Sequence, residues 1–357
     1  MSRLPILSPA EQLAAHLRDE IRRGVWQGEM PGAPRLSAEL GVDPKTVLAA
    51  LALLEHEGLL VSRGVGKRRG IEHSGKHAAR PLRIGILLND RWEKRLDYIV
   101  ELQHGLLEAG HDAFFVQQSL LDLGMDAKRV RRLVKTETAD AWVIGGGSRG
   151  VLEGFSGQAP PAFALFGRFE GVSIAAAVPE KIPAYLAVAD RLVELGHRRI
   201  ALLARKSRRL PEPGRSESAF LQRLAFHGLS TGSFNLPDWE DDRDGFHSML
   251  EKLFRFTPPT ALVVQEAFLF TATHHFLARR GLRVPEDVSM VCSDDDSSFA
   301  WCKPSVSRIR WLSAPIVRRV IDWAARIGQG KADLRQTFTK AEWLEGETIG
   351  PPNATGA

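Results

Sequence analysis

The sequence predicts an α/β protein, with a small helical N-terminal domain and a larger domain made of two lobes of doubly wound parallel sheet. The first 70 or so residues show helical periodicity with clear start and stop signals, and then become basic. The polar stretch from Glu72 to Pro81, rich in small residues, is typical of a linker. Beyond it, short apolar segments alternate with amphipathic ones, which is the pattern of parallel strands joined by helices.

Composition limits the compartment and the partners of the chain. Its 357 residues are enough for two or three domains, and its net charge of +5 mildly favours polyanionic partners. With only two cysteines, Cys292 and Cys302, no disulfide framework is expected. The N-terminus becomes charged too early for a signal peptide, and no apolar run approaches the roughly 20 residues of a membrane span. We therefore expect a soluble cytoplasmic protein without a membrane partner.

The N-terminal domain contains three predicted helices. The first begins at Ser8–Glu11, a capping box with proline at the first helical position. A short second helix ends at Gly41. The third has Asp43 as its N-cap and Pro44 at its first position, and ends before Gly58. Its predicted buried stripe is Val47, Ala50, Leu51 and Leu54. A short helix, a tight turn with glycine and a second helix are typical of a helix-turn-helix.

The stretch SRGVGKRRG, Ser62 to Gly70, combines three glycines with four cationic residues. Such a composition suits a loop around nucleotide phosphates or a basic β-hairpin along the phosphates of DNA. The spacing of a phosphate loop is not met, because Val61 and Arg68 stand where glycine and serine or threonine are required. Residues on both sides of the stretch have strand character, so we expect a hairpin, the wing of a winged helix-turn-helix.

Seven apolar segments of the larger domain are predicted strands: 83–88, 113–117, 141–146, 162–166, 199–204, 261–265 and 288–292. Amphipathic helical stretches separate them, and this alternation implies two doubly wound lobes. Ligands in such folds bind at the carboxyl ends of the strands, so we expect a binding cleft where the lobes face each other.

Residues 8–72 resemble the winged helix-turn-helix domain of GntR-type transcription regulators, through the stretch 11–60 and the loop SRGVGKRRGI. The resemblance implies binding to double-stranded operator DNA by the recognition helix and the wing. Pro44 and Leu48 depart from the family pattern, in which arginine is common at both positions. The DNA-binding residues that the resemblance implies are Arg35, Ser37, Lys45, Thr46, Arg63, Gly66, Lys67, Arg68 and Arg69.

The stretches 192–203 and 279–311 resemble the effector domain of LacI/GalR-type regulators and periplasmic sugar-binding proteins. Joined to a GntR-type domain, this architecture is similar to that of arabinose-responsive repressors. The resemblance implies a homodimeric repressor whose DNA affinity changes when a small molecule, a sugar or sugar derivative, binds between the lobes. The effector-binding residues that it implies by position are Arg215, Gln265, Glu266 and Asp294. Asn89, Asp90 and Arg91 are added because they end the first strand at the mouth of the cleft, and Trp301 as an aromatic ring suited to stacking on a sugar.

The expected domain boundaries follow from these patterns. Residues 1–72 form the DNA-binding domain, 73–81 the linker, 82–346 the two-lobed periplasmic-binding-protein-like effector domain, and 347–357 a C-terminal tail.

Two other functions stay open on the residues alone. A solute-binding protein of a transporter is expected to carry an export signal and to lack a DNA-binding domain. A nucleotide-using α/β enzyme would use Gly145–Gly147, which follow a predicted strand. No catalytic residue is predicted, because no triad motif is present. The consecutive carboxylates Asp294–Asp296 suit a hard cation, but consecutive side chains point in different directions, so we expect neither a metal site nor a cofactor.

Overall fold

The computed structural model describes residues 8–22, 25–26, 28–57, 59–64, 67–71, 80–157 and 160–353. The chain divides into two compact units, the first containing the N-terminal domain and the second nearly all of the larger domain. Within the described ranges, no helix has both the length and the apolar character needed to cross a membrane.

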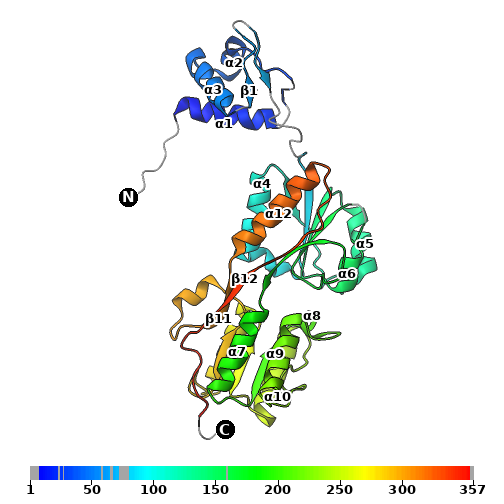
Figure 1. The fold of residues 1–357 in the computed structure, drawn as a ribbon, viewed down its shortest axis with the longest axis vertical. Coiled ribbons are helices and arrows are strands. Elements are labelled where there is room, and N and C mark those ends of the chain that lie inside the picture. Colours follow the sequence, from blue (N-terminus) through cyan, green and yellow to red (C-terminus); the bar gives the residue numbers. More distant parts are fainter. Residues whose placement is uncertain are drawn as a thin grey trace. The chain divides into compact units, whose positions relative to one another are not determined.

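Among the residues that the structure describes, the N-terminal domain contains three helices and one antiparallel pair of short strands (Figure 1). In chain order these are α1 (Pro9–Arg22), α2 (Ala33–Leu40), α3 (Pro44–His56), β1 (Leu60–Val61) and β2 (Gly70–Ile71). The predicted capping box is confirmed, since Ser8 N donates to Glu11 Oε2 at 2.7 Å and Glu11 N donates to Ser8 Oγ at 3.3 Å. Asp43 caps α3 as predicted, accepting a hydrogen bond from Lys45 N at 2.8 Å.

A small core explains why these three helices pack together. The predicted stripe of α3 is fully buried and meets Leu13, Leu17 and Ile21 of α1 and Leu36 of α2. The turn between α2 and α3 depends on Gly41, whose φ of 65° lies in the left-handed region that favours glycine. Leu60 pairs with Ile71 across β1 and β2, and both side chains close the core from the strand side.

The larger domain is built on ten strands in the order β4-β3-β5-β6-β7-β12-β11-β10-β9-β8. Their bounds are β3 Arg83–Leu87, β4 Asp112–Phe115, β5 Ala141–Gly145, β6 Ala162–Leu165, β7 Ala175–Glu180, β8 Ile200–Leu203, β9 Ala261–Val264, β10 Ser289–Cys292, β11 Ser307–Trp311 and β12 Gln336–Leu344. All seven predicted strands are present, whereas β7, β11 and β12 lie outside the predicted segments. The expected α/β domain with two lobes of parallel sheet is confirmed.

Helices cover both faces of the sheet in each lobe. They are α4 (Asp97–Glu108), α5 (Ala127–Thr136), α6 (Arg149–Glu153), α7 (Ile182–Glu194), α8 (Lys206–Arg209), α9 (Arg215–Phe226), α10 (Arg243–Phe256), α11 (Ala267–Arg279) and α12 (Ser313–Gly328). Two 3₁₀ turns, η1 (Arg91–Arg95) and η2 (Ser297–Trp301), follow strand ends. In the first lobe, α4 and α12 lie on one side of the strands and α5 and α6 on the other (Figure 1).

The chain passes between the lobes three times. It crosses from β7 into α7, returns from β11 into α12, and crosses again within β12. The long strand β12 pairs in parallel with β7 through residues 336–340 and antiparallel with β11 through residues 341–344 (Figure 1). The two lobes therefore share one strand, and three neighbouring segments connect them.

The larger domain continues beyond residue 346, where the sequence placed the start of a tail. Thr348 and Ile349 are buried in the second lobe, and Thr348 Oγ1 donates to Met290 O at 2.7 Å. Ser289 Oγ donates to Gly350 O at 3.0 Å. These contacts fix the segment against β10, which is the physical reason that it is part of the domain.

Candidate functional site

A cavity of about 1780 Å³ lies between the two lobes, at the carboxyl ends of their strands. Its lining comes from the residues that directly follow β3, β5, β6 and β7 of the first lobe and β8, β9 and β10 of the second. In parallel α/β folds this end of the sheet is where ligands bind, because loops from several strands converge there.

Asp294 connects two of the segments that pass between the lobes. Its Oδ1 accepts a hydrogen bond from Trp311 Nε1 at 2.6 Å and lies 3.2 Å from Lys181 Nζ. Lys181 Nζ also donates to Ser293 O at 3.0 Å. Since Lys181 follows β7 and Trp311 ends β11, a single carboxylate of the second lobe holds both segments.

Three carboxylates surround the guanidinium of Arg205, just after β8. Asp241 Oδ2 lies 3.1 Å from its Nε, Asp90 Oδ2 3.5 Å from Nη2, and Glu266 Oε2 3.8 Å from Nη1. Asp90 belongs to the first lobe, so this cluster joins the lobes across the cleft. One guanidinium faces three carboxyl groups here.

Two glutamates of the cleft have strongly shifted pKa values. The pKa of Glu266 is raised to about 7, chiefly by burial; Arg205 opposes the shift, and Asp294 contributes to it. Burial also raises the pKa of Glu93 to about 7, with Glu266 as a second cause. Perturbed carboxyl groups in a cleft mark a candidate functional site.

The cleft also contains buried polar atoms without a hydrogen bond and residues with a strained backbone conformation. Within the part of the chain that is described, Asn89 Oδ1 and Glu266 Oε2 are buried and take part in no hydrogen bond. Glu266 and Phe166 both have φ of 64°, in the left-handed region that non-glycine residues rarely adopt. Such strain costs of order 1–3 kcal/mol per residue and gathers at binding sites.

Aromatic rings form part of the cleft lining. Tyr98, Phe166 and Trp311 contact each other edge to face, with ring centroids 5.4 to 5.6 Å apart. Trp92 of the first lobe also meets Phe268 of the second, at a centroid distance of 4.9 Å. The cleft thus offers flat apolar surfaces beside carboxylates.

A second group of contacts joins the lobes on the side of α8. Arg168, after β6, donates through Nη2 to Glu212 O at 2.6 Å and through Nε to Ser207 O at 3.1 Å. Next to it, Arg208 forms a two-point ion pair with the fully buried Glu217, at 3.0 and 3.2 Å. This ion pair fixes the loop whose carbonyls Arg168 contacts.

Five of the eight predicted effector-binding residues line the cavity, namely Asn89, Arg215, Gln265, Glu266 and Asp294. Asp90 lies outside the lining but pairs with Arg205. Arg91 and Trp301 also lie outside the lining. The Arg91 guanidinium is held by Asp122 at 2.6 Å, and the Trp301 side chain is 91% exposed, because η2 directs it into solvent.

Four charged residues of the cleft were not predicted from the sequence: Glu93, Lys181, Arg205 and Arg208. Each follows a strand closely, and this position could have singled them out. The strand before Lys181 was not predicted, and the resemblance gave no role to the others.

The glycine cluster 145–147 and the acidic run 294–296, weighed as a nucleotide site and a metal site, both have structural explanations. A Cβ on Gly146 would come within 2.9 Å of Asn89 Cβ, and one on Gly147 within 2.8 Å of Leu152, so close packing accounts for the glycine cluster. Asp295 pairs with Arg308 at 2.7 Å, and Asp296 caps η2. An ion pair and a helix cap therefore account for two members of the acidic run.

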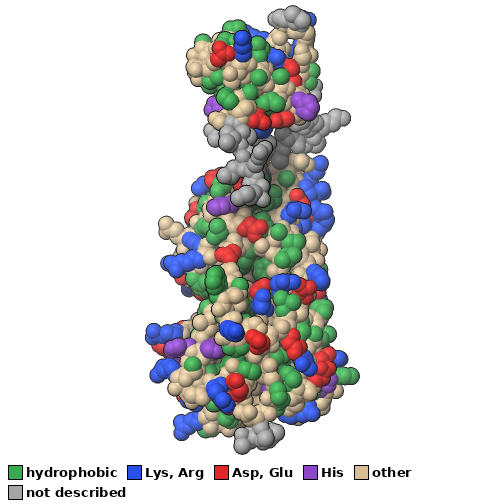
Figure 2. All heavy atoms as spheres, turned by 90° about the vertical axis from the view of Figure 1, so that its left-hand side faces the viewer, with side chains coloured by type: hydrophobic (Ala, Val, Ile, Leu, Met, Phe, Trp, Pro, Cys, Tyr) green, Lys and Arg blue, Asp and Glu red, His purple; other side chains and the backbone are tan. Residues whose placement is uncertain are grey.

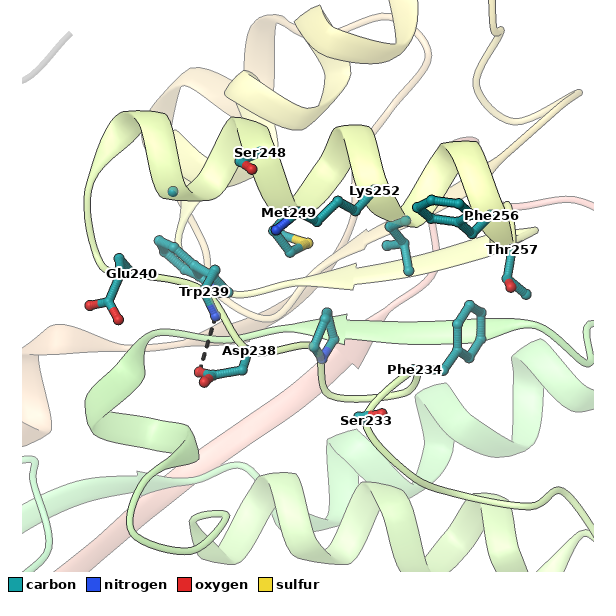
Figure 3. Close-up of a pocket in the computed structure, with 13 residues that line it drawn as sticks. Ser233, Phe234, Asp238, Trp239, Glu240, Ser248, Met249, Lys252, Phe256 and Thr257 are labelled. Atoms are coloured by element: carbon teal, nitrogen blue, oxygen red, sulfur yellow. Dashed lines mark hydrogen bonds between the residues drawn. The ribbon is translucent and has the colours of Figure 1, made fainter.

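A smaller cavity of about 590 Å³ lies in the second lobe, between α10 and the segment 233–240 (Figure 3). Met249, Lys252 and Phe256 of α10 face Phe234 and Trp239 across it (Figure 3). The segment covers the edge strand β8, where Leu202 N donates to Asn235 O at 2.7 Å. This cavity is not among the strand ends that form the cleft.

Charged side chains on the larger domain are mixed in sign. On the face drawn in Figure 2, Lys and Arg side chains alternate with Asp and Glu over both lobes. A concentrated basic surface is therefore not visible on this face of the larger domain.

The predicted DNA-binding residues divide by their partners within the N-terminal domain. Arg35 pairs with Glu39 at 2.7 Å, Arg63 with Glu29 at 3.1 Å, and Arg69 with Glu55 at 2.6 Å. The Ser37 hydroxyl donates to Val42 O at 2.6 Å, so it stabilises the turn before α3. Thr46 is half-buried; Lys45, Lys67 and Arg68 are exposed and have no ion pair among the described residues; and Gly66 lies outside these residues.

Comparison with known proteins supports the fold of the larger domain. A family profile described as "periplasmic binding protein-like domain" matches residues 189–349. The lactose operon repressor of Escherichia coli K12 is 27% identical over 173 residues, 47% of this chain and 46% of that protein. The chain thus spans about half the length of this curated relative.

Solved structures extend the likeness to most of the chain. A LacI family transcriptional regulator from Enterococcus faecium, with bound ribose, is 18% identical and covers 75% of this chain and 99% of its own, with a TM-score of 0.59. The transcriptional regulator CelR in complex with cellobiose is 15% identical and covers 89% of this chain and 100% of its own, with a TM-score of 0.60. At these identities the likeness shows a shared two-lobed fold. None of these three relatives is named as a GntR-type regulator, so that resemblance stays a prediction.

Proposed function

We propose that this chain is a ligand-responsive DNA-binding transcription regulator, a repressor whose operator affinity changes when a small molecule binds between the lobes. One observation carries the proposal. The same chain joins a helix-turn-helix to a two-lobed domain with a cavity of about 1780 Å³ at its strand ends. A cytoplasmic location, the absence of enzymatic turnover and a homodimeric state belong to the same proposal.

The N-terminal domain supports DNA binding through its geometry. The helices α2 and α3 meet at a tight turn, and the antiparallel pair β1 and β2 follows α3. These features support the proposal that the domain acts as a winged helix-turn-helix. In this proposal α3 enters the major groove, and the loop 62–70 contacts phosphates as the wing. Lys45, Lys67 and Arg68 are the primary phosphate contacts, because their charges are not shared with a carboxylate in the described domain.

The effector is proposed to be a sugar or sugar derivative. Hydroxyl groups would donate to the buried acceptors Asn89 Oδ1 and Glu266 Oε2, which have no hydrogen bond among the described residues. The rings of Tyr98, Phe166 and Trp311 offer apolar surface for the C–H face of a sugar ring. The E. faecium relative holds ribose and CelR holds cellobiose, which agrees with a ligand of this class.

The link between the two sites is a change in population. A ligand that contacts both lobes favours the arrangement in which those contacts coexist, and so shifts the equilibrium between lobe arrangements. Asp294 is proposed to take part, because its Oδ1 already contacts two of the connecting segments.

The test measures DNA binding by the full-length chain across a salt series, using the DNA upstream of its own gene. We expect affinity to fall steeply with salt, and a variant with Lys67→Ala and Arg68→Ala to bind all sequences more weakly. Glu194→Gln, which removes an exposed carboxylate of the second lobe, is the matched control without effect. Salt-independent or absent DNA binding would refute the proposal.

The effector half of the proposal needs its own measurement. A thermal-shift screen of sugars and sugar acids, followed by DNA release with each hit, tests it. We expect a stabilising ligand that changes DNA affinity, and Asp294→Asn to weaken its binding. A ligand that stabilises the protein without any change in DNA affinity would contradict the coupling between the sites.

A further inference from the structure

The solvent-facing side of α3 is apolar. Leu48 and Leu53 are 47% and 36% exposed, and Ala49 and Ala52 are exposed between them. With 3.6 residues per turn, these four positions lie on one face, opposite the buried stripe. A surface helix normally carries charged or polar side chains on that face.

Neighbouring charges indicate what covers this face. Lys45 stands at its N-terminal end, and the ion pair of Arg69 with Glu55 at 2.6 Å places the loop with Lys67 and Arg68 beside α3. An apolar strip next to unpaired cations complements a groove between two rows of phosphates, and it would attract a second copy of the same chain poorly.

The face has few groups that could read bases through hydrogen bonds. The side chains suited to base edges are arginine, lysine, asparagine, glutamine, the carboxylates, serine and threonine, and α3 offers only the exposed Lys45 and the half-buried Thr46 among these. The half-buried Glu55 is occupied by Arg69. The one apolar group in the major groove is the C5 methyl of thymine, which alanine and larger apolar side chains contact.

We propose that Leu48, Ala49 and Ala52 of α3 recognise thymine methyl groups in the major groove, so that the operator half-site is specified by thymines and not by guanines. The inference rests on the proposed DNA-binding function and adds the class of base that is read. Leu48, Ala49 and Ala52 lie in the first three turns of α3, the part of a recognition helix that reaches base edges.

The expected size follows from the burial of a methyl group. Losing one buried methyl weakens binding about fourfold. With two contacted methyls in each half-site of a dimer, replacing all four thymines by uracil weakens binding by about 250-fold.

The experiment uses the full-length chain. Duplexes are first selected from a randomised library, and the enriched site is then resynthesised with deoxyuridine in place of each thymidine, which removes only the methyl. In a parallel series each thymine is replaced by cytosine or by 5-methylcytosine. We expect uracil and cytosine to weaken binding, and 5-methylcytosine to restore part of the loss by returning a methyl to the same place.

A double-mutant cycle assigns the methyl to the helix. Leu48→Asn should lower affinity for the thymine duplex, and replacing thymine by uracil should then lower the affinity of this variant little further. Leu334→Asn, which changes an exposed leucine of the larger domain, should lose as much affinity on that replacement as the wild type does. Equal affinity for thymine and uracil duplexes overturns the inference while leaving DNA binding intact. Failure to enrich any duplex overturns the proposed function itself. If Leu48→Asn instead dissociates a dimer and the methyls have no effect, the face is an interface between copies, which also overturns the inference.

Discussion

Replacing Glu266 with glutamine removes one negative charge from the most crowded carboxylate cluster of the cleft. The side chain is 27% exposed, but its Oε2 is buried without a hydrogen bond, and burial raises the pKa of this carboxyl to about 7. Arg205, 3.8 Å away, opposes the shift without cancelling it, because Asp90 and Asp241 share the same guanidinium. The charged form of Glu266 is therefore disfavoured in the folded protein.

The sign of the pH effect follows from linkage. A carboxyl with a raised folded-state pKa binds its proton more tightly when folded, so its contribution to stability is present at low pH and is lost as the pH rises towards 7. For a carboxyl whose pKa is 4.5 in the unfolded chain and about 7 in the folded protein, the free energy of unfolding falls by about 2.5 kcal/mol between pH 5 and pH 8. For a domain of this size it corresponds to a difference in Tm of about 5 °C.

The assay is thermal unfolding of ligand-free protein at several pH values between 5 and 8. We expect Glu266→Gln to match the wild type near pH 5 and to be more stable by about 5 °C at pH 8. Comparing the two proteins removes the contributions of other titrating groups, among them His111 and His197, whose pKa values burial lowers. Glu194→Gln, at an exposed site, serves as the matched control. A difference between Glu266→Gln and wild type that stays constant with pH would refute the reasoning.

The remaining predictions concern the DNA contacts and the two cores. Lys67→Ala with Arg68→Ala should lower the slope of log affinity against log salt by about 4, because each protomer of the proposed dimer loses two phosphate contacts. Arg63→Ala, whose charge is shared with Glu29, should lower the slope by less, as measured by fluorescence anisotropy. Arg208→Met should destabilise the larger domain by about 3–5 kcal/mol in urea unfolding, because a fully buried carboxylate loses its partner. Leu51→Ala should destabilise the N-terminal domain by about 2–5 kcal/mol, seen as loss of DNA binding at lower urea concentration.

Local signals made the N-terminal helices and most strands predictable from the sequence. The capping box at Ser8–Glu11 and the cap at Asp43 act over three residues or fewer, and the structure contains both. The stripe of α3 has the 3.6-residue period of a helix with one buried face. Buried parallel strands appear in the sequence as short apolar runs, because both of their faces are covered.

The elements that escaped prediction depend on distant partners. The strand β12 alternates half-buried and exposed residues along its first six positions, and it exists because β7 and β11 pair with its two halves. Nothing local marks Lys181, whose role comes from Asp294, 113 residues away in the sequence. Trp301 was predicted in the cleft from its residue type, but the direction of η2 decides where the ring lies.

The cleft combines features that each lower the stability of the folded chain. Glu266 adopts a left-handed backbone conformation, carries a buried acceptor without a partner and stands among other carboxylates. Phe166, which directly follows β6 of the first lobe, has the same φ of 64°. A packed core free of functional demands would replace such residues, since strain and unsatisfied acceptors cost free energy that burial elsewhere must offset. Their occurrence at strand ends on both sides of one cavity is expected if a ligand with hydrogen-bond donors supplies the missing interactions. When a ligand supplies these interactions, their free energy favours the lobe arrangement that binds the ligand. A switch between two DNA affinities requires such a shift in population.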